Sequence, residues 1–257
     1  MEPLKITFHL KTPVVIMDMP VHLDALIAWA QTQEKLAQGV EVDNIRELAA
    51  ELPFEEYTTD AGTVWKASVL VPESIQFTTT TQWVRRTDPY QITDGLEKGW
   101  LSTGKRYKPE KGYKIDTSSG MLKNHRQIYT VQMVDKMHAW CIGDLDRIEQ
   151  LLLDHVRAIG AKTKMGHGQI REDVFGNPMI EVERDKAAVD KDKWKLRFMS
   201  NKVSNDYALM RSPLKPPYWD KSSAVMGWFP LNFIGLRNGI MSLSKEKGGE
   251  RNGCKRN

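Results

Sequence analysis

The spacing of apolar side chains changes within the first forty residues, and each spacing predicts one element. Over residues 4–11 (LKITFHLK), apolar and polar side chains alternate, which is typical of a β-strand with one buried face. Residues 22–38 change to helical spacing, and Asp24 stands in the first turn, where the helix dipole favours an anion. The chain is therefore expected to begin with a strand followed by a helix.

The next apolar segments predict strands. Residues 64–71 and 74–84 are rich in the β-branched and aromatic side chains that suit a pleated sheet. Residues 126–142 have the same character and predict strand structure that ends near Gly143.

A second helix is expected over residues 144–160, with Asp144 as its N-cap and Gly160 at its C-terminal end. Residues 169–183 then predict a further strand or hairpin. The resulting order, βαββαβ, predicts an α+β fold of the ferredoxin-like (RRM-like) type over residues 1–185.

Four stretches differ from this pattern. Residues 41–60 carry seven acidic residues and one arginine, which predicts a short helix at 43–51 on a solvated face that is poor for nucleic acid. Residues 98–126 carry eight basic and two acidic residues, a net charge of +6, and are expected to form an inserted basic hairpin or thumb. Residues 186–244 mix aromatic residues with prolines and predict an irregular extension packed on the core, and 245–257 predict a disordered basic tail.

Composition narrows the class of protein only slightly. Lys and Arg total 37 against 33 Asp and Glu, so the net charge of +4 permits an acidic partner without requiring one. Cys141 and Cys254 lie far apart, outside any CxxC or Cys/His cluster, so we expect neither a disulfide framework nor a metal site, nor any cofactor. No stretch reaches the ~18 apolar residues that a membrane span needs, and we expect a soluble protein of the reducing cytoplasm.

The stretch RAIGAKTKMGHGQIRED, residues 157–173, is the first candidate for a binding site. It lacks the GK[ST] ending of a phosphate-binding P-loop. It also follows a predicted helix and precedes a predicted strand, whereas a dinucleotide fingerprint follows a strand and precedes a helix. Two interpretations remain open. The stretch is a tight turn after a helix, or a loop whose glycines Gly166 and Gly168 let an extended polyanion approach while Lys162 and Lys164 supply charge.

Histidines raise the question of catalysis. His167 lies between two glycines, and His125 lies beside Arg126 in the basic insertion, so either could act as a general base toward a ribose hydroxyl. No defined partner residue can be assigned to either histidine, and H-E-x-x-H and G-x-S-x-G motifs are absent. We therefore predict a protein that is not an enzyme, with a metal-independent endoribonuclease as the alternative.

The basic insertion is the second candidate. It interleaves cations with aromatic rings, and this combination suits single-stranded nucleic acid, because phosphates meet the cations and bases stack on the rings. A solvated flexible loop is the alternative. The charged and aromatic residues concerned are Lys98, Trp100, Lys105, Arg106, Tyr107, Lys108, Lys111, Tyr113, Lys114, Lys123 and Arg126.

Two sequence blocks carry a resemblance to a known family. They are ITFHLKTPVVIMDMPVHLDALIAWA (6–30) and IEQLLLDHVRAIGAKTKMGHGQI (148–170). With the two βα halves and the glycine-rich loop, they resemble the RAMP superfamily of CRISPR-associated proteins, and more specifically the small Cas-five-like subunit of type IV CRISPR effector complexes, the third Csf protein.

The resemblance implies a non-catalytic subunit that grips the 5′ handle of a CRISPR RNA and caps a filament of large RAMP backbone subunits. It also implies contact with a small Cas-eight-like subunit, a place near the protospacer-adjacent motif (PAM) of the target DNA, and a helicase that acts downstream. By position, residues 162–168, including His167, would face the RNA backbone, the insertion 98–126 would be the thumb, and His22 would lie at an RNA-contacting edge. A ferredoxin-like ligand-binding domain unrelated to RNA remains the third alternative.

Overall fold

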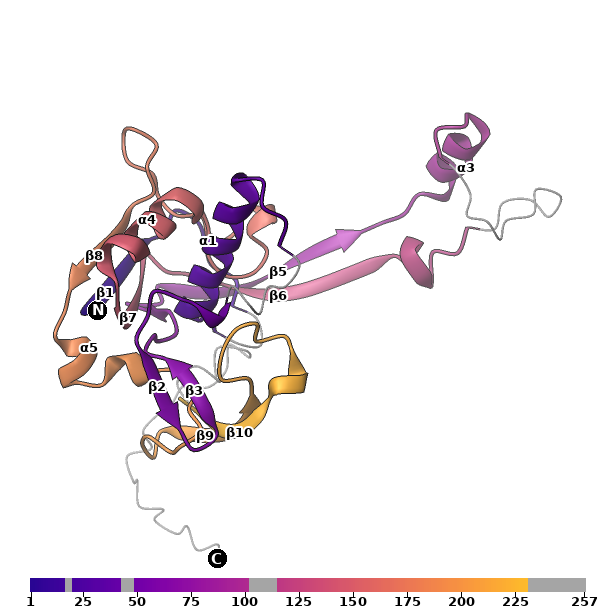
Figure 1. Ribbon diagram of the computed structural model, residues 1–257. Helices are drawn as coiled ribbons and strands as arrows, with labels where there is room; N and C mark the ends of the chain where they lie inside the picture. The colour runs from indigo at the N-terminus through magenta and orange to yellow at the C-terminus, as the bar shows by residue number, and fades with distance from the viewer. Residues whose placement is uncertain (17–19, 43–48, 102–114, 231–257) are drawn as a thin grey trace, which may run out of the picture. The chain divides into compact units, whose positions relative to one another are not determined.

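The computed structural model describes residues 1–16, 20–42, 49–101 and 115–230 of the chain (Figure 1). The chain divides into two units. The first unit consists of Met1–Thr79 and of the chain from Thr130 onward, and the second unit is Thr80–Tyr129. The predicted tail at 245–257, and most of the predicted helix at 43–51, lie outside the described residues.

The core of the first unit is built on a four-stranded antiparallel sheet. Its strand order is β4-β7-β1-β8, formed by Val71–Pro72 (β4), Lys136–Gly143 (β7), Glu2–His9 (β1) and Ile180–Arg184 (β8). The registers place apolar residues opposite one another: Ile6 lies between Ala139 and Val182, and Phe8 between Met137 and Ile180. The alternation along residues 4–11 therefore marks a strand with one buried face, as predicted.

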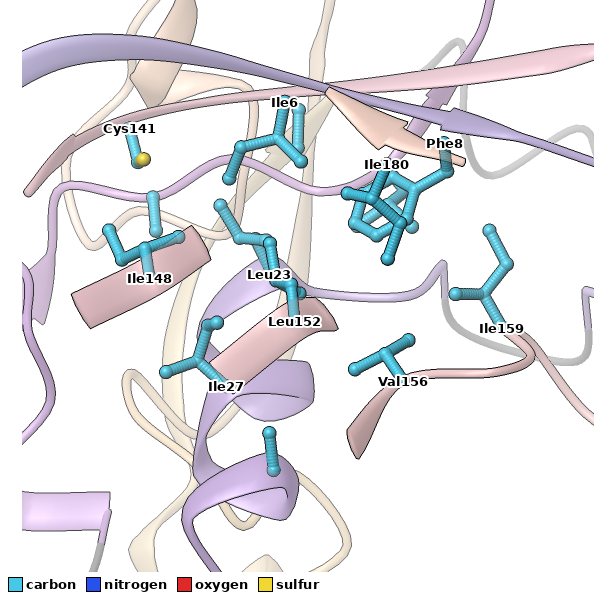
Figure 2. Packing of buried hydrophobic residues seen from close by; sticks show 14 of the residues in the cluster. Ile6, Phe8, Leu23, Ile27, Cys141, Ile148, Leu152, Val156, Ile159 and Ile180 are labelled. Atoms are coloured by element: carbon cyan, nitrogen blue, oxygen red, sulfur yellow. The ribbon is translucent and has the colours of Figure 1, made fainter. Parts of the chain in front are cut away.

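Two helices pack on the apolar face of this sheet. They are Leu23–Ala37 (α1) and Leu145–His155 (α4), and the Asp144 side chain caps α4 as predicted by accepting a hydrogen bond from the Arg147 amide, 3.2 Å away. Figure 2 shows the side chains that meet between sheet and helices, with Ile6 of β1 toward Leu23 and Ile148, and Phe8 beside Ile180 of β8. The labelled helix residues Leu23, Ile27, Ile148 and Leu152 have no exposed surface. Burial of this apolar area is the main stabilisation of the unit.

The predicted second helix is shorter than its periodicity suggested. It ends at His155 instead of Gly160, because Val156 is already extended and the chain from Ala158 to Ala161 bridges to neighbouring segments. Val156 and Ile159 are still buried in the core, so the apolar spacing continued beyond the helix. Gly160 therefore does not end a helix.

The predicted strand at 64–71 is broken into two pieces. Gly62–Trp65 (β3) pairs with Glu56–Thr59 (β2) in a separate antiparallel pair, and β4 pairs with β7 at the edge of the main sheet. Ala67, between β3 and β4, forms an isolated bridge to Cys141 of β7. The carbonyls of Trp65 and Ala67 accept hydrogen bonds from the buried guanidinium of Arg197, at 2.5 and 3.0 Å. The Ala67 amide also donates to the carbonyl of Trp65 at 2.8 Å, which closes a three-residue turn and interrupts the strand there.

The region after residue 186 contains more regular structure than its proline content predicted. It contains Ala187–Asp190 (α5), an antiparallel pair of Tyr207–Ser212 (β9) and Val225–Pro230 (β10), and 3-10 turns at Lys193–Lys195 and Lys221–Ser223. Its apolar side chains form a second core cluster with the 64–69 segment. The buried members of that cluster are Val64, Val69, Ile142, Trp194, Phe198, Met199, Leu214 and Phe229.

The second unit contains helix Pro89–Glu97 (α3) and a 3-10 turn at Gly120–Leu122, and it shares the paired strands Phe77–Arg85 (β5) and His125–Met133 (β6) with the first unit. Asp88 caps α3 by accepting a hydrogen bond from the Tyr90 amide. Most of the predicted basic insertion belongs to this unit, but residues 102–114 lie outside the described residues. The structure as a whole is a mixed arrangement of helices and small antiparallel sheets, which agrees with the α+β class. No helix among the described residues is long and apolar enough to cross a membrane.

A buried ion pair connects the C-terminal region to the start of α1. Arg197 and Asp24 are fully buried, with 3.1 Å between Nη2 and Oδ2. The same guanidinium donates to the carbonyl of Leu214 (2.8 Å) and to the hydroxyl of Tyr218 (2.7 Å), and that hydroxyl donates to Asp24 at 2.7 Å. Burial opposes the charge of Arg197, but Tyr218 and Asp24 raise its pKa above the ordinary value, so the arginine stays protonated.

We predict that Arg197→Met strongly destabilises the protein. The variant leaves the buried Asp24 carboxylate without its cation, and removing one partner of a buried pair costs about 3–5 kcal/mol. Chemical denaturation followed by circular dichroism measures the loss. The matched control is Arg184→Met, which removes an exposed ion pair with Glu2 and should change stability little. Equal stability of the two variants would contradict the structural role given to Arg197.

Candidate nucleic-acid interface

The glycine- and lysine-rich loop stands on a hydrogen-bonded base of three segments. The Ile159 amide donates to the carbonyl of Gly168 (2.8 Å), and the Ile170 amide donates to that of Arg157 (3.0 Å), so the two sides of the loop pair with each other. The loop also pairs with the chain after β1, because the Gly168 amide donates to the carbonyl of Pro13 (2.9 Å). The loop is therefore fixed at its base on both sides.

The tip of the loop is a compact turn. Thr163–Met165 form a 3-10 turn between two residues in left-handed conformation, Lys162 with φ 60° and Gly166 with φ 86°. The Met165 amide donates to the carbonyl of Lys162 at 2.9 Å, and the Gly166 amide to that of Thr163 at 3.0 Å. These bonds satisfy backbone groups within the tip, so its side chains project from a structured turn.

The loop and the segments paired with it carry a group of cations, which we call the loop cations: Lys11, Arg157, Lys162 and Lys164. Lys162 is half-buried and the other three are exposed. Lys11 joins the group because its amide donates to the carbonyl of Gln169 at 2.7 Å. Among the residues that the structure describes, Lys11 and Lys164 have no ion-pair partner, so they can neutralise phosphates of a bound polyanion.

The polar face of the main sheet is electrostatically different. Lys5 of β1 pairs with Glu183 of β8 at 2.9 Å, and His9 lies 3.0 Å from Glu181 on the same pair of strands. Trp140 on this face is covered by the Lys193 ammonium, 4.2 Å from the ring centroid. Because Glu183 neutralises Lys5 and Glu181 lies beside His9, these two strands offer less positive potential to a polyanion than the loop does.

The structure brings some predicted site residues together and separates others. Lys162, Lys164, Gly166, His167 and Gly168 form one loop, in which His167 is half-buried. His22 instead is 2% exposed and stacks on Tyr218 with ring centroids 4.1 Å apart. Its ring nitrogens have no hydrogen-bond partner among the described residues, and its burial removes it from the RNA contacts considered below.

Only the edges of the predicted insertion are described. Lys98, Lys123 and Arg126 are exposed, and Lys98 both pairs with Asp94 (2.9 Å) and lies 4.9 Å from the centroid of the Trp100 ring. Trp100 is 75% exposed, so one ring face remains accessible for stacking. His125, in the second unit, lies 6.0 Å from the ring of Trp83. The remaining predicted contacts, namely Lys105, Arg106, Tyr107, Lys108, Lys111, Tyr113 and Lys114, lie outside the described residues.

Sequence reasoning missed Lys11 and Arg157 as loop cations. Lys11 closes a strand pattern 151 positions before Lys162, and only the pairing of residues 9–15 with the loop brings the two together. One weak signal for Lys11 was present in the sequence, because this lysine directly follows Leu10, the last buried residue of the strand pattern. Among the described residues, no group of three or more His, Cys, Asp or Glu side chains is placed to hold a metal ion.

We predict that Gly168→Ala destabilises the loop more than Gly166→Ala does. Both glycines have positive φ, which costs a residue with a Cβ about 1–2 kcal/mol. At Gly168 a Cβ would also lie 1.9 Å from the carbonyl oxygen of Ile159, whereas at Gly166 it would enter open space. Thermal unfolding of the two variants measures the difference, and equal melting temperatures would contradict the close packing at Gly168.

We also predict that His22 makes the fold sensitive to acid. Burial, reinforced by Arg197, lowers the pKa of His22 well below 6.5. As the pH falls through 6.5, the unfolded chain binds a proton at His22 that the folded chain does not, so stability decreases by up to about 1.4 kcal/mol per pH unit. Urea denaturation of wild type and His22→Phe between pH 7.5 and 5.5 tests this. The variant should have the flatter dependence, and parallel curves would contradict the assignment.

Comparison with known proteins identifies the family of the chain. The chain matches the sequence model of the family described as CRISPR type IV associated protein Csf3 over residues 2–230, which include the main sheet, both helices on it, the loop and the second unit. A search of the curated proteins found no match. Because the match spans nearly nine-tenths of the 257 residues, this chain belongs to the Csf3 family of proteins associated with type IV CRISPR systems.

Proposed function

We propose that this chain is a non-catalytic CRISPR RNA-binding subunit of a type IV effector complex, and that the loop at 157–173 contacts the backbone of the 5′ handle. The observation that carries the proposal is the arrangement of the loop cations. They lie on three hydrogen-bonded segments, around a tip whose backbone is held by its own hydrogen bonds. A rigid cationic loop binds phosphates without paying the entropy of ordering itself.

The strand order supports a RAMP-type core. In the order β4-β7-β1-β8, β4 follows the first helix and lies at one edge, and β8 follows the second helix and lies at the other edge. All neighbouring strands are antiparallel. This is the arrangement expected of a ferredoxin-like βαββαβ unit in which β5, α3 and the start of β6 form an insertion between the second and third core strands. In this proposal the loop follows the second core helix, as the resemblance to RAMP proteins implies.

The second unit would act as the thumb on the handle or on the first spacer nucleotides. Exposed cations at Arg85, Arg86 and Lys123 and the exposed ring of Trp100 favour this role. Membership of the Csf3 family makes other subunits of a type IV complex plausible partners. The proposed partners are the large RAMP backbone subunits, a small Cas-eight-like subunit and target DNA near the PAM, with a helicase acting downstream.

We predict that neutralising three loop cations weakens RNA binding. The variant Lys11→Gln/Lys162→Gln/Lys164→Gln should bind a single-stranded RNA with the repeat-derived handle at least tenfold more weakly at about 0.1 M salt. Each lost phosphate contact should also reduce the slope of log affinity against log salt by about 0.7, and together by about 2. Fluorescence anisotropy over a salt series measures both quantities.

The control for charge alone is Lys35→Gln/Lys191→Gln/Lys221→Gln, which removes the same charge from exposed positions outside the loop. His167→Gln should leave affinity within about twofold, because the proposed contact is made by cations and backbone. An unchanged salt slope in the loop variant would refute the loop as the RNA contact. A severe loss in His167→Gln would instead assign the histidine a direct role.

A further inference from the structure

An apolar cavity lies between α1 and the segment before the last 3-10 turn, entirely within the first unit. Its volume is about 450 Å³. Aromatic rings and prolines dominate its lining, and none of its described lining residues is Lys, Arg, Asp or Glu. The lining consists of Pro20, Val21, His22, Ala25, Ala28, Trp29, Thr32, Gln33, Ala49, Pro216, Pro217, Tyr218 and Trp219.

Hydrogen bonds and ring stacking hold one wall of the cavity in place. Tyr218 is fixed by hydrogen bonds to Asp24 and Arg197, and its ring stacks on that of His22. On the other side of Trp219, the Asp220 side chain accepts from the amide of Ser222 at 3.0 Å. Tyr218 therefore forms a fixed wall of the cavity, which loses little conformational entropy when a partner binds.

Two tryptophans at this cavity keep much of their surface exposed. Trp29 of α1 is 45% exposed and Trp219 is 75% exposed. Large exposed aromatic residues beside a pre-formed apolar cavity are typical of protein interfaces, where tryptophan is enriched among the residues that dominate binding energy.

The charge of the cavity lining decides between a protein and a nucleic acid as its partner. Phosphates require cations close by, and no described cation lines the cavity. Glu51, two residues after Ala49 of the lining, is exposed, and its carbonyl accepts a hydrogen bond from the Gln31 side chain of α1. A carboxylate beside the cavity therefore favours an apolar group with a positive charge next to it.

We propose that this cavity docks another protein subunit of the type IV complex, by receiving a bulky apolar or aromatic side chain that is flanked by Lys or Arg. The proposal rests on the family assignment, which places the chain with other CRISPR proteins, and is independent of the proposed RNA contact. The cavity holds about one or two side chains, so it supplies the anchor of a larger interface. Glu51 beside the cavity attracts the basic flank of the partner.

The test uses the full-length chain, affinity-tagged and co-expressed with the other protein subunits of its type IV complex. In Trp29→Ala/Trp219→Ala, recovery of one subunit should fall at least tenfold relative to wild type. Trp219→Phe should retain most of it, because a large ring remains. Glu51→Lys should reduce recovery several-fold at low salt and less at high salt.

The matched control is Phe175→Ala, because Phe175 is 86% exposed and does not line the cavity. Thermal unfolding establishes that each variant folds, and anisotropy with handle RNA on the isolated chain measures RNA binding separately. Undiminished recovery of every subunit in the folded double-tryptophan variant would overturn the proposal. Loss of RNA binding with full subunit recovery would also overturn it, in favour of a nucleobase pocket.

Discussion

The buried pair of Arg197 and Asp24 is the constraint on which the first unit depends. A charged guanidinium without solvent contact needs hydrogen-bond partners, and the two terminal nitrogens of Arg197 contact Asp24, Tyr218 and three backbone carbonyls from distant parts of the chain. Its Nε has no hydrogen-bond partner among the described residues. The arginine therefore fixes where the 64–72 segment bends, where the 213–218 segment lies and how α1 begins. The second core cluster forms in the space that these contacts define.

This dependence explains what the sequence could and could not predict. Elements with one buried face were predictable, because alternation at 4–11 and helical spacing at 22–38 reflect burial directly. The break in the 64–71 strand was not, because the carbonyls at the turn accept hydrogen bonds from an arginine at least 130 positions away, whose burial no local pattern reveals. The end of α4 was misplaced for a related reason. Val156 and Ile159 are buried in an extended segment, and their spacing happens to continue that of the helix.

The candidate interface was predictable in part. Glycines and lysines at 160–168 indicated a loop able to approach a polyanion, whereas the contribution of Lys11 required the pairing of two segments that are distant in sequence. His22 illustrates the opposite case. As a histidine at a helix start it was a reasonable surface candidate, yet it is buried against Tyr218 because that tyrosine is held by the ion pair behind it. Residues whose environment is set by long-range contacts are the ones that local patterns misjudge.

The chain leaves the first unit and returns to it at neighbouring points. The amide of Gln76, just before β5, donates to the carbonyl of Met133 at the end of β6, 3.0 Å away. The ends of the intervening segment are thus already closed, and lengthening it adds loop entropy only slowly, by about 0.6 kcal/mol per doubling. The second unit is therefore a modular insertion: its length and charge can diverge among relatives, or be exchanged by engineering, while the sheet and the cationic loop keep their fold.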